Sequence, residues 1–206
     1  MGSVQAGVSV NEPGSREIPP ESESAGEADP ATLAAARAGD TAAYLRLLRH
    51  YDARLRALAW RVLHDADLMD DALQEVAVKA LRGLSGFRGE APLGAWLCRI
   101  AYTTAVTLRE RRDRLTPLDP AQLPDAPSQT DLADRVADAS AIDDALAALP
   151  AEQRVAVLLI DELGYDYSTA AHVLDVPLGT VASRVATARA RLRTELAPFF
   201  REGGAS

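Results

Sequence analysis

A segment late in the chain combines cationic and hydroxyl side chains at the spacing of a helix. Residues 177–193 contain four arginines and no acidic residue. Arginine can donate two hydrogen bonds to a guanine edge, and hydroxyls near a helix N-terminus can reach phosphates or bases. The chemistry indicated is DNA recognition, and the candidate residues are Thr180, Ser183, Arg184, Thr187, Arg189 and Arg191.

A second basic segment carries an aromatic residue between its cations. Arg99, Tyr102, Arg109 and Arg112 are expected on the face of a helix opposite the apolar residues Leu97, Ile100 and Leu108. Cations can follow the phosphates of a single strand while an aromatic ring stacks on a base. This segment therefore predicts a second nucleic-acid surface.

A third helix has a charged stripe, made of Asp70, Asp71, Gln74, Glu75 and Lys79. Taken by itself, a solvated helix surface would have the same pattern. Neighbouring acids and His64 lack the spacing of metal ligands. The chain has no phosphate-binding loop, catalytic triad spacing or metal motif, so we expect neither an enzyme nor a cofactor. Its single cysteine, Cys98, allows no internal disulfide and fits a reducing cytosol.

The residues around the first segment have the pattern of a helix-turn-helix. We expect a helix over 143–149, a buried apolar run over 155–160, a short helix capped by Ser168, a turn at 175–179 and a longer helix from Thr180. Two helices of an ordinary bundle with a solvated arginine face are the alternative. The order of short helix, tight turn and longer basic helix favours binding in the major groove.

The other candidates lie on a group of about four helices. Expected are a helix over 30–39, an amphipathic stripe over 44–62, a helix over 67–81, a glycine-rich loop at 83–89 and a helix opened by Pro92. No apolar run alternates as a strand would. The predicted fold class is all-α, with two small helical domains: an N-terminal four-helix bundle-like domain and a C-terminal helix-turn-helix domain joined by a flexible acidic linker.

Charge is segregated along the chain. The 206 residues have 22 Lys and Arg against 30 Asp and Glu, a net charge of −8. Residues 1–30 contribute −5 and residues 115–140, with four prolines, contribute −4, so the remaining parts together carry +1 and do not oppose DNA binding. We predict a disordered acidic arm at 1–29, a helical domain at 30–113, a linker at 114–139, a helix-turn-helix domain at 140–197 and a tail at 198–206.

Nothing in the sequence indicates a membrane or a secreted protein. No 18-residue apolar run occurs, and the N-terminus lacks a basic segment followed by an apolar one. We expect a cytoplasmic protein without membrane insertion.

Two stretches resemble the bacterial RNA polymerase sigma factors of the extracytoplasmic-function (ECF) group, within the sigma-70 family. Residues 149–196, LPAEQRVAVLLIDELGYDYSTAAHVLDVPLGTVASRVATARARLRTEL, resemble the fourth conserved region of that group. Residues 71–112, DALQEVAVKALRGLSGFRGEAPLGAWLCRIAYTTAVTLRERR, resemble the second region. With the upstream helices, the resemblance covers about residues 31–113 and 140–197.

The resemblance implies a dissociable initiation subunit rather than an enzyme. In this family the second region binds the clamp helices of the polymerase β′ subunit and opens the −10 element. The fourth region binds the β flap and reads the −35 element, and an anti-sigma factor commonly holds the protein inactive. The family's polymerase-binding helix carries an Asp-x-x-Gln-Glu pattern, matched here by Asp71, Gln74 and Glu75, so we interpret the charged stripe as the polymerase-docking surface.

The resemblance also assigns the loop at residues 87–91 to a pocket for an extruded −10 base, which adds Phe87 and Arg88 to the second surface. Trp96 is expected in the core. The chain departs from the family at two places. Tyr102 and Thr103 replace the usual arginine and asparagine, and Ala182, Ala186 and Thr187 replace cationic or polar residues. We therefore predict weak −35 binding by the isolated domain, carried mostly by Arg184 and Arg189. A stand-alone helix-turn-helix regulator is the competing hypothesis.

Overall fold

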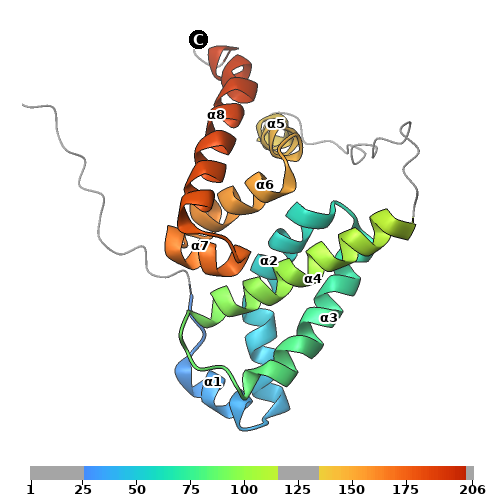
Figure 1. The fold of residues 1–206 in the computed structure, drawn as a ribbon, viewed down its shortest axis with the longest axis vertical. Helices are drawn as coiled ribbons and strands as arrows, with labels where there is room; N and C mark the ends of the chain where they lie inside the picture. The colour runs from blue at the N-terminus through green and yellow to red at the C-terminus, as the bar shows by residue number, and fades with distance from the viewer. Residues whose placement is uncertain (1–25, 116–134, 203–206) are drawn as a thin grey trace, which may run out of the picture.

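The computed structural model describes residues 26–115 and 135–202, and each regular element in these ranges is a helix (Figure 1). The all-α fold class is thus confirmed. In chain order the elements are α1 (Pro30–Arg37), α2 (Thr41–Leu63), α3 (Ala66–Leu84), α4 (Leu93–Leu115), α5 (Arg135–Ala147), α6 (Ala151–Val157), the π-helical turn η1 (Leu158–Glu162), α7 (Tyr167–Leu174) and α8 (Leu178–Glu202).

Aspartates start the first three helices. Asp29, Asp40 and Asp65 precede α1, α2 and α3, and each accepts hydrogen bonds from backbone N–H groups of the first turn. At its other end α2 stops at His64, whose φ of 49° and ψ of 37° are left-handed, a conformation unusual for a residue other than glycine. Helix α2 therefore ends at a fixed position, with the His64 side chain directly after its last turn.

The core of the N-terminal domain lies between α2, α3 and α4. Leu47, Tyr51, Leu55, Leu58 and Val62 of α2 are all buried, so the amphipathic stripe predicted for this helix is confirmed. From α3 the buried residues are Ala72, Val76, Ala80 and Leu84. Helix α3 runs from 66 to 84, so it begins one residue earlier and ends three residues later than the periodicity predicted.

The C-terminal domain contains the expected helix-turn-helix, with two corrections. The cap of α7 is Asp166, whose carboxylate accepts a hydrogen bond from the Thr169 backbone N–H at 2.6 Å; Ser168 lies inside the helix. Helix α8 begins at Leu178, two residues before Thr180, because the Pro177 carbonyl oxygen already accepts hydrogen bonds from the Thr180 and Val181 N–H groups, at 2.9 and 3.3 Å. Between the two helices, Asp175 adopts a left-handed φ of 57° and ends α7.

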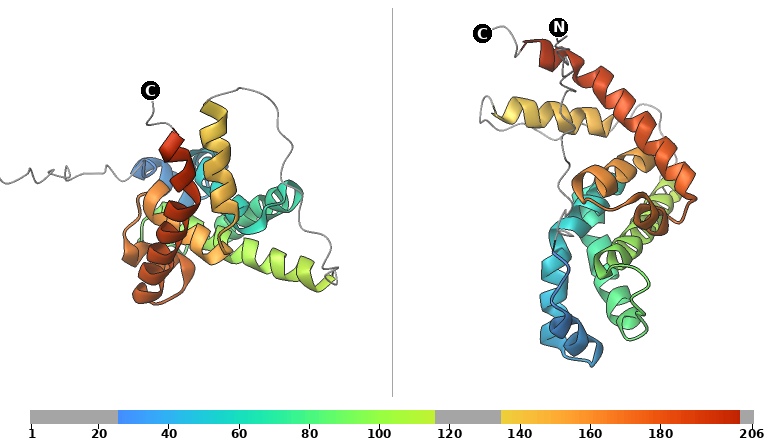
Figure 2. Two further views of the ribbon diagram at one scale, coloured as in Figure 1. Left: turned by 90° about the horizontal axis from the view of Figure 1, so that it is seen from above. Right: turned by 90° about the vertical axis from the view of Figure 1, so that its left-hand side faces the viewer.

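The two domains pack against each other (Figures 1 and 2). Helix α7 lies along α4, and α6 lies against α2. Buried apolar residues of both domains belong to one continuous core. Gly94 of α4 is needed there, since a Cβ atom at this position would lie 2.7 Å from the Tyr165 hydroxyl and 2.9 Å from Tyr51 Cε1. We call this packing of α6 and α7 on α2 and α4 the closed arrangement.

Some expectations for the terminal and linking segments fall outside the described residues, namely those for 1–25, 116–134 and 203–206. Next to these segments, at residues 26–28 and 135–139, the structure differs from the prediction. Gly26, Glu27 and Ala28 belong to the predicted arm but contact α2: the Ala28 N–H donates to the Tyr51 hydroxyl at 3.0 Å, and that hydroxyl donates to Glu27 at 3.1 Å. Helix α5 begins at Arg135, inside the predicted linker.

Candidate nucleic-acid interface

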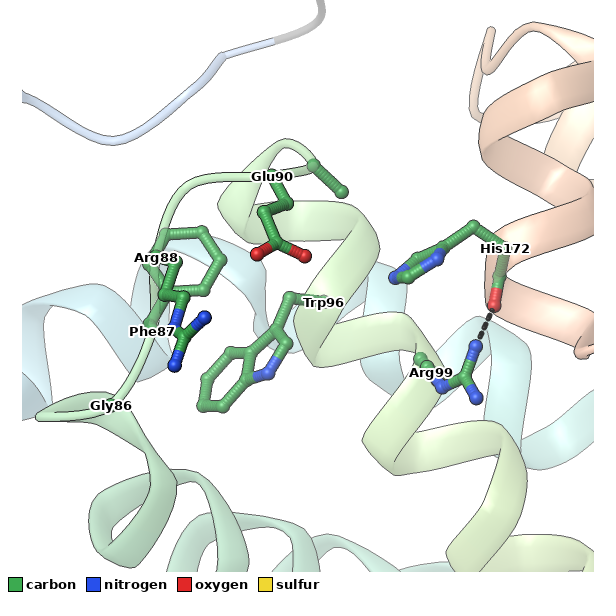
Figure 3. Close-up of a pocket in the computed structure, with 8 residues that line it drawn as sticks. Gly86, Phe87, Arg88, Glu90, Trp96, Arg99 and His172 are labelled. Carbon is green, nitrogen blue, oxygen red and sulfur yellow. Dashed lines mark hydrogen bonds between the residues drawn. The ribbon is translucent and has the colours of Figure 1, made fainter.

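The loop between α3 and α4 and the first turns of α4 form a pocket of about 390 Å³ (Figure 3). Phe87 and Trp96 make its aromatic wall, with ring centroids 5.3 Å apart. Arg88 and Glu90 from the loop point toward Trp96 in Figure 3, so cation, carboxylate and aromatic faces surround one space. This combination could stack on a nucleobase and hydrogen-bond to its edge.

Trp96 is a pocket residue that the sequence interpretation placed in the core. Its indole is only partly buried, and it rests against Gly83, where a Cβ atom would lie 3.0 Å from Trp96 Cζ2. Phe87 is the more buried partner, 8% exposed. The signal that could have revealed the pair is a glycine-rich loop with an aromatic residue, followed within ten positions by a tryptophan at the start of a helix.

Arg99 lies at the edge of the same pocket and connects the two domains. Its guanidinium donates to the His172 carbonyl oxygen of α7 at 2.5 Å (Figure 3). It also pairs with Asp175 at 3.0 Å. The His172 side chain also lines the pocket. In the closed arrangement, therefore, α7 covers the edge of the pocket where Arg99 lies.

Of the other residues predicted on this face of α4, Tyr102 and Arg109 face the C-terminal domain, whereas Arg112 pairs within the N-terminal domain. Tyr102 is half-buried, and burial raises the pKa of its phenol. Arg109 reaches Glu152 of α6 at 3.8 Å, and Arg112 reaches Asp65 at 3.9 Å. The structure thus groups Arg99, Tyr102 and Arg109 along one face, as predicted, but that face packs against the other domain instead of facing solvent.

The candidates on α8 divide into exposed and engaged residues. Thr187 and Arg191 are exposed, as is Ser183, whose hydroxyl donates to the Thr180 carbonyl oxygen at 2.9 Å. Arg184 is half-buried, and its Nη1 is buried without a hydrogen-bond partner among the described residues.

Arg189, by contrast, is held within its own domain. Its side chain forms a two-pronged ion pair with Asp161 of η1, with Nε 3.1 Å from Oδ2. Hydrogen bonds to Asp161 raise the guanidinium pKa.

The charged stripe of α3 borders a groove of about 380 Å³ between α2 and α3. Asp70 and Gln74 line it together with apolar side chains from both helices. Asp70 accepts a hydrogen bond from Arg56 of α2 at 3.0 Å.

Further along the stripe, Lys79 pairs with Glu75 at 3.1 Å and donates to the buried Thr104 hydroxyl of α4 at 2.9 Å. Asp71 is exposed. Val78 and Leu81 beside the stripe are 47% and 54% exposed, so this surface offers apolar as well as charged contacts.

Other kinds of site are absent from the part of the chain that the structure describes. It contains no group of three His, Cys, Asp or Glu side chains arranged to hold a metal ion. Cys98 is 1% exposed, and burial raises the pKa of its thiol to about 12. In residues 26–115 and 135–202, no helix is long and apolar enough to cross a bilayer.

Fold and site together define a two-domain helical protein, in which a helix-turn-helix accompanies an aromatic-lined pocket at the start of a basic helix. The comparisons with known proteins give the family. The model for Sigma-70 region 2 matches residues 47–115, and the model for Sigma-70, region 4 matches residues 139–192. The chain belongs to the ECF RNA polymerase sigma factors.

Curated relatives and solved structures agree with this assignment. The ECF RNA polymerase sigma factor SigM of Mycobacterium tuberculosis is 40% identical over 164 residues, which cover 80% of this chain and 82% of the relative. The sigma-H factor of Pseudomonas aeruginosa is 32% identical, over 80% of this chain and 91% of its own. The sigma factor RpoE of Bartonella quintana, solved in complex with the anti-sigma factor NepR, is 27% identical with a TM-score of 0.65, over 75% of this chain and 96% of that one.

Proposed function

We propose that this chain is a dissociable initiation factor that binds core RNA polymerase, recognises −35 and −10 promoter elements and promotes strand opening for a specific set of genes. It would do so without catalytic activity of its own. The observation that carries the proposal is the pocket of Phe87, Arg88, Glu90 and Trp96 at the N-terminal end of the basic helix α4. The same chain also contains a helix-turn-helix.

In this proposal the N-terminal domain holds the melted −10 strand. Unstacking a base costs a few kcal/mol, which a pocket that stacks and hydrogen-bonds the extruded base can offset. Phe87 and Trp96 supply the stacking surface, and Arg88 lies beside them. Once the C-terminal domain separates from α4, Arg99, Tyr102, Arg109 and Arg112 follow the backbone along this helix, and Tyr102 can stack on a neighbouring base.

The C-terminal domain reads the −35 element through α8. Ser183, Thr187 and Arg191 of this helix are already exposed, and Arg184 and Arg189 join them when they leave their present contacts. Thr180 and Ser183 lie in the first two turns of α8, where hydroxyls and backbone N–H groups can meet a phosphate. Arg184, Thr187, Arg189 and Arg191 follow at helical spacing. Because Ala182 and Ala186 offer no polar contact, we expect Arg184 and Arg189 to carry most of the affinity.

This division of labour can be measured as the salt dependence of binding to a −35 duplex. Each lost phosphate contact lowers the slope of log K against log salt by about one unit. Arg184→Ala and Arg189→Ala should each do this, whereas Arg46→Ala, which removes an exposed cation of α2, should not. An unchanged affinity and slope for Arg184→Ala would contradict its assignment.

We assign the groove and stripe of α2 and α3 to core polymerase, with the β′ clamp helices as the partner there and the β flap as the partner of the C-terminal domain. Asp70, Asp71, Gln74, Glu75 and Lys79 present polar contacts around exposed apolar residues, the composition of an interface whose charges set specificity and association rate. The proposed place of action is the cytoplasm, and an anti-sigma factor is the expected regulator.

Run-off transcription separates this proposal from a stand-alone regulator. Core polymerase plus this protein, with no other factor, should produce a transcript from a cognate promoter, and core polymerase alone should not. Asp71→Lys together with Gln74→Ala should abolish the transcript while leaving binding of the free protein to −35 duplex unchanged. Tight duplex binding without co-purification with core polymerase would favour the stand-alone regulator.

A further inference from the structure

His64 lies at the contact between the two domains. Its ring stacks on Trp60 of α2, with centroids 5.5 Å apart. On its other side, Nε2 lies 2.6 Å from Nη1 of Arg154, and Nδ1 lies 3.2 Å from the same atom. Arg154 belongs to α6, so this contact joins residues 90 positions apart across the domain boundary. Nη1 of Arg154 also donates a hydrogen bond to the Ala147 carbonyl oxygen at 3.3 Å.

The surroundings of this contact are rich in cations. Arg61 is only 14% exposed, and its partners Asp143 and Glu162 are 3.7 and 3.5 Å away, long for charge-assisted hydrogen bonds. Burial, and then the charges of Arg61 and Arg109, lower the pKa of Arg154. Within the described residues, Arg154 Nε is buried without a hydrogen-bond partner. A positive charge on His64 would therefore be repelled by Arg154 and Arg61, and neither acid that pairs with Arg61 forms a short ion pair.

Only a neutral imidazole can accept a hydrogen bond from a guanidinium, because a protonated ring has no free lone pair. The His64 contact with Arg154 therefore requires the neutral ring. Burial, followed by the charges of Arg154 and Arg61, lowers the pKa of His64 to about 4 in the closed arrangement. Opening would remove Arg154 and admit water, so the pKa would return toward the ordinary 6.5.

We propose that His64 is a proton-sensitive latch: neutral, it holds Arg154 and the closed arrangement, and protonated, it repels Arg154 and Arg61 and releases the C-terminal domain. His64 faces Arg154 of α6 and Arg61 of α2, and Asp65 is the next residue of the chain. The charged groups next to these residues are Asp143 of α5 and Glu162 of η1, at 3.7 and 3.5 Å from Arg61, and Arg112 of α4, at 3.9 Å from Asp65. Glu152 of α6 lies 3.8 Å from Arg109 of α4.

The direction of the pH effect follows from the two pKa values. The open arrangement binds more protons than the closed one between about pH 6.5 and pH 4. The closed arrangement is therefore fully favoured above pH 6.5 and loses stability as the pH falls through this window. Between pH 7 and pH 5 the ratio of open to closed molecules should rise by up to roughly 20-fold.

Small-angle scattering of the full chain between pH 7.5 and pH 5 tests the latch, with far-UV circular dichroism at each pH. The wild type should expand as the pH falls, at constant helix content. His64→Asn should stay compact over the whole range, since asparagine tolerates the left-handed backbone, can accept from Arg154 and does not titrate. His50→Asn, which removes an exposed histidine of α2, should keep the wild-type response.

A wild type that remains compact at pH 5, or a His64→Asn variant that expands in parallel with it, would overturn the latch. So would an expansion that accompanies loss of helix, because opening leaves each domain folded. The use of the latch in transcription rests on the proposed function, but scattering needs neither DNA nor polymerase. Its outcome is therefore independent of the run-off experiment.

Discussion

At the scale of single residues, the observed surroundings of Trp96 and Arg99 differ most from those that the sequence predicted. Trp96 was expected in the core and instead forms the wall of the pocket with Phe87. Arg99, which is predicted to contact DNA, holds the C-terminal end of α7 in the closed arrangement. Both residues lie on α4 within one turn of each other, so the pocket and the domain contact are adjacent.

Replacing Trp96 by alanine should slow promoter opening. Stacking of a base on an aromatic side chain contributes about 1–3 kcal/mol, so we expect the rate to fall roughly 5- to 150-fold. Fluorescence of a 2-aminopurine placed in the −10 element reports opening directly. Trp96→Phe, which keeps an aromatic face, should retain most of the rate. An equal loss in both variants would argue against stacking as the role of this side chain.

Freeing Arg189 should strengthen −35 binding by the free chain. Asp161→Asn removes its partner, and because this pair is partly exposed its loss should cost less than about 1 kcal/mol of stability. The affinity for the duplex should rise at low salt, because Arg189 no longer has to leave Asp161 before it meets a phosphate. In the double variant with Arg189→Ala that gain should disappear. If it persists, the effect comes from removing the acid rather than from releasing the arginine.

At the scale of elements, local patterns were sufficient for most of the helices. The three- and four-residue spacing of Leu47, Tyr51, Leu55 and Leu58 predicted α2, because side chains on one helix face share one environment. Helix starts were less predictable. Asp166 and Ser168 can both cap a helix, and the choice depends on backbone angles that composition does not contain.

A pair of variants tests the corrected start of α7. Asp166→Ala should lower the free energy of unfolding by about 0.5–2 kcal/mol, because it leaves first-turn N–H groups such as that of Thr169 without their acceptor. Ser168→Ala, already inside the helix, should change it by a few tenths at most. Urea unfolding of the full chain at pH 7 measures both. A larger loss of unfolding free energy for Ser168→Ala than for Asp166→Ala would show that Ser168 is the N-cap, as the sequence predicted.

At the scale of the whole molecule, the contact between the domains could not be predicted from the sequence. Gly94 and Tyr165 are far apart in the chain, and Arg99 and Asp175 each look like solvent-facing residues of their own helix. Periodicity identifies a buried face but not the element that buries it. For the same reason, Arg99 and Arg109 were assigned to DNA alone, and their partners Asp175 and Glu152 were not predicted.

Gly94→Ala should loosen the closed arrangement. The added methyl would meet the Tyr165 hydroxyl and the buried ring of Tyr51, and overpacking of this kind costs about 1–3 kcal/mol. Scattering at pH 7.5 should reveal a larger particle, and DNA affinity of the free chain should rise. Gly179→Ala, with nothing within 4 Å of the new atom, is the matched control and should stay compact. A compact Gly94→Ala chain would show that the contact adapts.

The acidic segments should reduce DNA binding by the free chain through charge alone. Deleting residues 1–25, which keeps the contacts of Gly26, Glu27 and Ala28 with α2, and changing the five aspartates of residues 115–140 to asparagine should raise affinity at low salt. Near 1 M salt the Debye length is about 3 Å, so the difference should vanish. An affinity unchanged at low salt would refute this repulsion.

The two bonds of Arg99 have a consequence for how promoter elements communicate. The side chain cannot hold α7 and a DNA strand at once, so a single-stranded −10 oligonucleotide competes with the C-terminal domain for it. Linkage makes such competition reciprocal. An oligonucleotide bound at one domain should therefore increase the affinity of the other domain for a separate −35 duplex. The two elements would act as mutual effectors without being joined in one DNA molecule.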